Sequence, residues 1–167
     1  FRTSKALGYL FRDDIQHRDF SQDESVTTRK AEKQDLPHIV KLKEGVFESN
    51  EEIVSYIDKK KILIFEKGDR LLGFGIHSRT VEDRDGFDIG VAVVRSLRGK
   101  GIGSYIIKQM KNLCYKNGWI PTCGCDIDNI ASKKCLEKAG FISKYILVEF
   151  SDEFIDRRTS KRNIPST

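Results

Sequence analysis

The feature that most constrains this chain is a short apolar run followed by a glycine-rich basic turn and an amphipathic segment. The run over residues 89–94 is rich in β-branched side chains, which is typical of a largely buried strand. Apolar residues then recur at helical spacing from Ile102 to Leu113. The turn between them holds Arg98, Gly99, Lys100, Gly101 and Gly103. The sequence therefore predicts a strand, a turn and a helix in direct succession.

This turn suits an anion. The first turn of a helix leaves backbone N–H groups without intrahelical partners, and the helix dipole makes that end positive. Glycine lets a ligand approach the backbone because it carries no Cβ. A phosphate or pyrophosphate is the natural ligand for such a turn, although glycines that only tighten packing are the alternative. The spacing matches neither the P-loop nor the dinucleotide-binding fingerprint.

Length and composition narrow the class of protein. A chain of 167 residues is one domain by default, and no apolar run approaches the ~20 residues that span a bilayer. The net charge of +5 is mild, and its basic residues concentrate over 95–117. No secretion signal is evident, so we expect a cytoplasmic protein without a metal site. Free thiols are expected at Cys114, Cys123, Cys125 and Cys135.

The remaining elements alternate between strands and helices. For residues 1–24 we expect a short helix, an ordered docking arm or the end of a preceding domain. Because the chain opens at Phe1, one interpretation is that it is a piece of a longer polypeptide. Asp35 and Asn50 are expected to cap helices. Lys108, Lys111 and Lys116 are expected away from the apolar face of the central helix. Strands are expected over 26–31, 62–66, 71–77, 119–127 and 141–150, and a last helix over 128–139.

Three stretches together resemble the GNAT N-acetyltransferase superfamily. They are 26–31 with Asp35-Leu36-Pro37, then Arg98-x-x-Gly101-x-Gly103, then Asn129-Ile130-Ala131-Ser132 with Leu136-Glu137-Lys138-Ala139-Gly140-Phe141. The resemblance covers a GNAT-like domain over 25–150, leaving an extension over 1–24 and a tail over 151–167. It implies a mixed α/β fold, with a mostly antiparallel twisted sheet, helices on both faces and one splayed parallel strand pair.

The resemblance also implies a function. It is an acetyl-CoA-dependent transfer of an acetyl group to a primary amine of a small molecule or a protein. The cleft would lie where the strand at 88–94 splays from the strand at 119–127. The implied cofactor contacts are the backbone of Val91 and Val93, the Arg98 side chain, the backbone of Gly99, Lys100, Gly101, Ile102, Gly103 and Ser104, and the side chains of Asn129 and Ser132.

The acid–base chemistry is less defined by the sequence. A backbone N–H near Val93 could polarise the thioester carbonyl. Asp88 is the candidate base, with a solvated carboxylate at a strand end as the plainer interpretation. Glu66 and His77 are weaker candidates. Many relatives carry a tyrosine at the position of Leu136, so the departing thiolate takes its proton from water or from another residue, or catalysis is weak.

Two other classes of function stay open. One is an acyl-CoA-binding regulatory or interaction module without turnover. The other is a nucleic-acid binder that uses the basic segment 95–117. A membrane partner is not expected, and a homodimer is an open alternative. Acids flank the central strand at Glu82, Asp83, Asp85 and Asp88, where they are either an acceptor-binding patch or a solvated loop.

Overall fold

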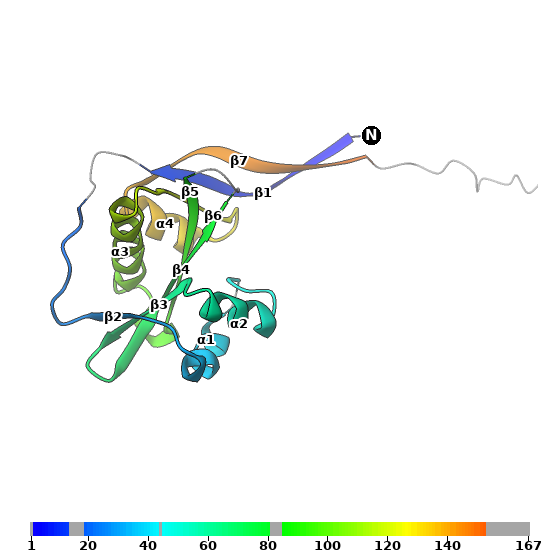
Figure 1. Cartoon of the computed structure of the whole chain (residues 1–167). Coiled ribbons are helices and arrows are strands. Elements are labelled where there is room, and N and C mark those ends of the chain that lie inside the picture. The colour runs from blue at the N-terminus through cyan, green and yellow to red at the C-terminus, as the bar shows by residue number, and fades with distance from the viewer. Residues whose placement is uncertain (1, 14–18, 44, 81–84, 153–167) are drawn as a thin grey trace, which may run out of the picture.

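The computed structural model describes residues 2–13, 19–43, 45–80 and 85–152 (Figure 1). Within these ranges seven strands form one sheet in the order β2-β3-β4-β5-β6-β1-β7. The strands are β1 Arg2–Asp13, β2 Thr27–Lys30, β3 Ile62–Lys67, β4 Arg70–Arg79, β5 Gly86–Val93, β6 Ile120–Asp126 and β7 Phe141–Asp152. The helices are α1 Leu36–Leu42, α2 Asn50–Asp58, α3 Ile102–Lys116 and α4 Ile130–Lys138, with short 3-10 turns η1 Lys33–Asp35 and η2 Arg95–Leu97.

The predicted fold class is confirmed. Every neighbouring strand pair of this sheet is antiparallel except β5 and β6, which are parallel. The expected hairpin is β3–β4, and the expected strand–turn–helix unit is β5 followed by α3. Among the described residues, no helix is long and apolar enough to cross a bilayer.

Two hydrophobic cores lie on opposite faces of the sheet, and Figure 1 shows α1 and α2 on the other side of it from α3 and α4. Ile89 of β5 packs with Met110 of α3 and Leu136 of α4. Ala92 of the same strand belongs to the core that contains Ile53 of α2. Because side chains alternate along a strand, the odd positions of β5 face α3 and α4, and the even positions face α1 and α2.

The N-terminal segment corrects the sequence prediction. Residues 2–13 form no helix but the long strand β1, which docks between β6 and β7. Leu7, Tyr9 and Phe11 stand at every second position, which is the pattern typical of a strand. The strand's partners, β6 and β7, stand at the other end of the sequence. The predicted tail over 151–167 begins inside β7, which ends at Asp152, and 153–167 lie outside the described residues.

Residues 19–26, the described part of the connection that leads into β2, pack on α3. The Asn112 side chain accepts the Phe20 N–H at 3.0 Å and donates to the Phe20 carbonyl at 2.7 Å. Gln109 donates its Nε2–H to the Ser21 carbonyl at 3.0 Å. These bonds satisfy backbone groups of a segment that has no regular secondary structure. Figure 1 shows α3 between this segment and the sheet.

Three local expectations change. Ser49 caps α2 by accepting the Glu52 N–H at 3.1 Å, and Asn50 is the first helical residue. Asp35 precedes α1, but its carboxylate binds Arg29 at 2.7 Å and the Glu32 N–H at 2.8 Å instead of the helix. Lys111 is completely buried rather than solvated. Asp35 and Lys111 bind partners that helical spacing does not reveal, whereas the change at α2 is a shift of the cap by one residue.

Candidate functional site at the parted strands

The site begins where β5 and β6 separate. Their parallel ladder has three pairs, Gly86↔Ile120, Phe87↔Pro121 and Asp88↔Thr122. Beyond this point β5 continues to Val93 and β6 to Asp126, with no further pair between the two strands in the described chain. The backbone beyond Asp88 therefore borders an opening through the sheet.

One edge of that opening offers unused backbone groups. Two hydrogen bonds join the ends of β5 to β4. The Val94 N–H donates to the Leu72 carbonyl, and the Thr80 N–H donates to the Gly86 carbonyl, both at 3.0 Å. Antiparallel ladders alternate, so the even residues of β5 point their backbone groups at β4. The N–H and C=O groups of Val91 and Val93 therefore point toward β6, across the gap. An extended amide-bearing ligand could pair with them as another strand would.

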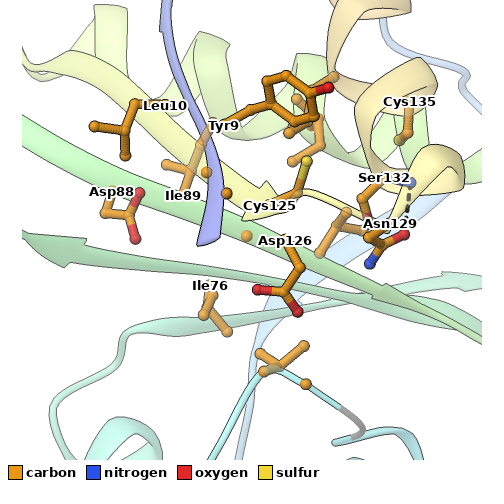
Figure 2. Close-up of a pocket in the computed structure, with 18 of the residues that line it drawn as sticks. Tyr9, Leu10, Ile76, Asp88, Ile89, Cys125, Asp126, Asn129, Ser132 and Cys135 are labelled. Atoms are coloured by element: carbon orange, nitrogen blue, oxygen red, sulfur yellow. Dashed lines mark hydrogen bonds between the residues drawn. The ribbon is translucent and has the colours of Figure 1, made fainter. Parts of the chain in front are cut away.

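The opening is a pocket of about 690 Å³ that reaches both faces of the sheet (Figure 2). Ile107 of α3 and Leu136 of α4 line it on one face. Gly45 and Val46, from the connection between α1 and α2, line it on the other together with Ile76 of β4. A ligand that lies against α3 and α4 can thus meet a second ligand that enters past α1 and α2.

The glycine turn lies at the carboxyl end of β5, directly before α3. Gly99 and Gly101 have φ of +78° and +82°, a region that favours glycine. The Tyr105 N–H donates to the Gly101 carbonyl at 3.0 Å as the first bond of the helix. The N–H groups of residues 102–104 precede that bond and have no helical acceptor. The exposed side chains of Arg98 and Lys100 add positive charge beside them.

The two remaining polar residues of the turn have other roles. The Nε–H of Arg98 donates to the Val93 carbonyl at 3.2 Å, which fixes the guanidinium beside the end of β5. Ser104 is buried, and its hydroxyl donates to the Cys135 carbonyl of α4 at 3.2 Å. The Ser104 hydroxyl is therefore engaged within the protein, which leaves its backbone N–H as the group that the sequence analysis assigns to a ligand.

Gly103 has a packing role, and its backbone N–H remains at the start of α3. A Cβ at this position would stand 2.9 Å from Cys135 Sγ, which is closer than side chains tolerate. The glycine lets the first turn of α3 approach α4. The spacing Gly101-x-Gly103 thus combines one turn glycine with one helix-packing glycine.

The start of α4 contributes the second predicted motif. Asn129 caps this helix, because its Oδ1 accepts the Ser132 N–H at 3.0 Å (Figure 2). Asn129 and Ser132 both line the pocket. Among the described residues the Asn129 amide N–H₂ and the Ser132 hydroxyl have no hydrogen-bond partner, so both are left for a ligand.

Asp88 is the predicted base, and it lines the pocket from the even face of β5. Solvent reaches it through the pocket mouth, yet the surrounding protein desolvates the carboxyl and raises its pKa from 3.8 to about 6. A carboxylate with a raised pKa is a stronger base than an ordinary one. The position of Asp88, beside the last β5–β6 pair, marks the floor of the opening.

The weaker candidates are not part of the pocket lining. Glu66 binds Arg29 with Nη2–Oε1 at 3.0 Å. His77 packs against Trp119, with ring centroids 5.5 Å apart, and burial lowers its pKa. Both side chains make structural contacts outside the pocket.

Sequence reasoning missed several pocket residues. Tyr9 and Leu10 come from β1, whose strand character was not predicted. Cys125 and Asp126 end β6, and Asp126 shares the even face with Asp88. Figure 2 shows carboxylates of both aspartates directed into the pocket. The signal for Asp126 was its place at a strand end directly before the Asn129 motif.

The cysteines are free thiols, two of them at this pocket. Cys125 and Cys135 line it, and burial raises the pKa of both. In the described ranges, no group of three histidine, cysteine or acidic side chains is arranged to hold a metal ion.

Comparisons with known proteins bear on this geometry. No curated protein matches the chain by sequence. An acetyltransferase of the GNAT family from Colwellia psychrerythraea superposes with a TM-score of 0.76 at 19% identity, over 89% of this chain and 56% of that one. A putative acetyltransferase from Salmonella typhimurium, solved with its cofactor acetyl-CoA, gives 0.60 at 18% identity, over 71% of this chain and 80% of that one.

A third structure, ribosomal-protein-alanine N-acetyltransferase from Brucella melitensis, gives a TM-score of 0.60 at 17% identity and covers 74% of this chain and 96% of its own. At such identities the likeness is one of fold. The chain spans little more than half the length of the Colwellia protein. The sequence model of the acetyltransferase (GNAT) family matches residues 18–141, most of the chain, and the chain therefore belongs to the GNAT acetyltransferase family.

Proposed function

We propose that this protein is an N-acetyltransferase that moves an acetyl group from acetyl-CoA to a primary amine of a small molecule or a protein. The observation that carries the proposal is the parted β5–β6 ladder, whose free edge leads from the glycine turn to the Asp88 carboxyl. Free thiols are the usual state of cysteines in the cytoplasm, where we place the reaction.

The chain's groups fit acetyl-CoA in chemistry and in order. The unbonded N–H groups at the start of α3, with Arg98 and Lys100, suit the pyrophosphate. The edge of β5 at Val91 and Val93 suits the amides of the pantetheine arm. Asn129 and Ser132 face that arm from α4. A chain held in this way points its thioester toward the floor of the opening, where Asp88 stands.

The reaction needs a neutral amine and a polarised carbonyl. The backbone N–H of Val91, which lies on the free edge of β5 between Val93 and Asp88, is the group we assign to the carbonyl oxygen. The amine enters from the α1–α2 face, where Asp88 takes its proton as the new C–N bond forms. With a pKa of about 6, Asp88 is largely ionised at neutral pH and ready to accept that proton.

One observation favours a second candidate, an acyl-CoA-binding module with little turnover. Leu136 is 5% exposed, lines the pocket and brings no hydroxyl to it. Steady release of free CoA with any amine would reject this candidate.

The first test is a calorimetric titration of acetyl-CoA. We expect Arg98→Ala and Gly101→Asp to abolish binding, because they remove a cation and place a carboxylate among the anion-binding N–H groups. Gly68→Asp is the matched control, since Gly68 also has positive φ, +57°, but lies in the β3–β4 turn. Backbone strain of about 1–2 kcal/mol is common to both.

A screen of amines by mass spectrometry follows, with release of CoA measured in parallel. An acetylated amine and a free thiol formed in equal amounts is the expected result. A folded parent that does not bind acetyl-CoA would remove the proposed function, and binding without turnover of any amine would favour the module.

A further inference from the structure

The pocket wall contributed by β1 carries one phenol, and we propose that Tyr9 gives the proton that the departing CoA thiolate needs. The proposal rests on the proposed function and adds a catalytic residue to it. Tyr9 lies outside the segment matched by the family model, which begins at residue 18.

The register of the sheet places Tyr9 across the opening from the free edge of β5. Asp88 pairs with Thr122, so Val91 stands level with Cys125 on the far side of the gap. Cys125 pairs with Tyr9 on β1. These three residues line the pocket at one level, and their side chains share the face covered by α3 and α4. A pantetheine arm along Val91 therefore has Tyr9 on the opposite wall.

The Tyr9 hydroxyl has no hydrogen-bond partner among the residues that the structure describes. Its ring is half-buried, packs at 6.3 Å from Phe11 and has Lys133 Nζ 4.2 Å from its centroid. Figure 2 shows the hydroxyl directed toward α4, where Ser132 and Cys135 line the pocket. The ring is thus fixed on its faces while its O–H remains free to donate.

The other protic groups on this wall are poorer donors. Burial raises the pKa of Cys125 and Cys135, so each holds its proton more tightly than an ordinary thiol would. An aliphatic hydroxyl such as that of Ser132 is a weaker acid than a phenol. Leu136 has no proton to give, and the Ser104 hydroxyl already donates to Cys135.

The proposed step balances. The amine nitrogen attacks the thioester carbon, Asp88 takes the amine proton, and the C–S bond breaks with its electron pair on sulfur. Tyr9 donates its phenolic proton to that sulfur, and the phenolate regains a proton from solvent. The products are the amide and CoA with a free thiol.

The test compares Tyr9→Phe with Tyr145→Phe. The first variant keeps the ring and its contacts with Phe11 and Lys133. The second removes an exposed hydroxyl on β7 that is not part of the pocket. We expect Tyr9→Phe to bind acetyl-CoA as the parent does and to lose about 100-fold in kcat. Tyr145→Phe should match the parent in both.

A second measurement needs no amine. CoA and desulfo-CoA, which lacks only the sulfur, are titrated above neutral pH, where the thiolate is populated. The parent should prefer CoA severalfold over desulfo-CoA, and Tyr9→Phe should lose that preference because the O–H to sulfur bond is gone.

The outcomes separate the two proposals. A kcat for Tyr9→Phe within threefold of the parent, or equal preference for CoA in parent and variant, would overturn the role of Tyr9. Loss of acetyl-CoA affinity in Tyr9→Phe would also overturn it, since Tyr9 would then be a binding residue. If the parent acetylates no amine, the proposed function fails, while the desulfo-CoA comparison still decides whether Tyr9 contacts the sulfur.

Discussion

The ammonium of Lys111, completely buried on α3, lies 2.5 Å from the Asp13 carboxylate at the end of β1. Lys111 also donates to the Ala139 carbonyl at 3.0 Å and lies 4.7 Å from the centre of the Phe141 ring. Asp13 accepts a second bond from the Tyr115 hydroxyl at 2.5 Å. This group ties the N-terminal strand to α3 and to the end of α4, so the strand that carries Tyr9 is anchored by charge.

Breaking this pair should be costly. Lys111→Met leaves a buried carboxylate without its cation, and we expect a loss of about 3–5 kcal/mol in the free energy of unfolding, measured by urea denaturation. Lys116→Met, an exposed lysine on the same helix, is the control and should change little. The double variant Lys111→Met with Asp13→Asn should lose less than the sum of the single losses. Strict additivity would contradict the coupling.

The pH dependence of turnover should report Asp88. Its pKa is raised to about 6, so the base is protonated and inactive below that pH. We expect kcat/KM to fall as pH drops through about 6, and Asp88→Asn to lose about 100-fold and this limb of the profile. Asp85→Asn, which changes an exposed carboxylate outside the pocket, should keep both. If Asp88→Asn kept the fall in kcat/KM at low pH, the titrating group would belong to the substrate and not to Asp88.

The raised pKa of Asp88 should also lower the free energy of unfolding at high pH, whereas most aspartates raise it. A raised pKa means that folding disfavours the ionised form, so the penalty is present above pH 6 and disappears as pH falls below 3.8. Asp88→Asn should therefore be more stable than the parent at pH 8, with a difference that shrinks toward pH 4. Urea midpoints across this range measure it. A constant difference would contradict desolvation as the cause.

The Arg29 guanidinium should stabilise the opposite end of the sheet. It bridges Asp35 and Glu66, and it holds the pKa of Asp35 below the ordinary 3.8. We expect Asp35→Ala to lose about 2 kcal/mol at pH 7. Because a lowered pKa stabilises only the ionised form, the difference from the parent should shrink as pH falls below 3.8. Asp58→Ala, which removes an exposed contact with Lys33 at 3.9 Å, should lose under about 1 kcal/mol.

The effect of Gly103→Ala on stability should change sign when the Cys135 sulfur is removed. Alanine there would clash with Cys135 Sγ, so Gly103→Ala should destabilise the protein. In the background of Cys135→Ala the sulfur is absent, and the same change should stabilise the helix by about 0.5–1 kcal/mol. Thermal or urea unfolding of the four proteins decides this. Destabilisation in both backgrounds would mean that Cys135 is not the obstacle.

Local pattern determined a large part of this structure. The β3–β4 hairpin, β5, the turn and α3 follow from short-range alternation, helical spacing and glycine, because each of these acts within a few residues. The motifs at Arg98 and Asn129 identified the starts of α3 and α4, and the start of α4 lines the pocket. Even so, the reason for Gly103 lay in its contact with Cys135, which spacing alone could not show.

Tertiary structure decided the rest. The sequence shows alternation at Leu7, Tyr9 and Phe11 but not that β1 pairs with β6 and β7, because strand partners far along the chain leave no local trace. That one placement buries Lys111 against Asp13, and it brings Tyr9 level with Val91 across the opening. The sequence alone thus determined the glycine turn and the family's fold, whereas the wall facing the free edge of β5 was decided by pairing between distant strands.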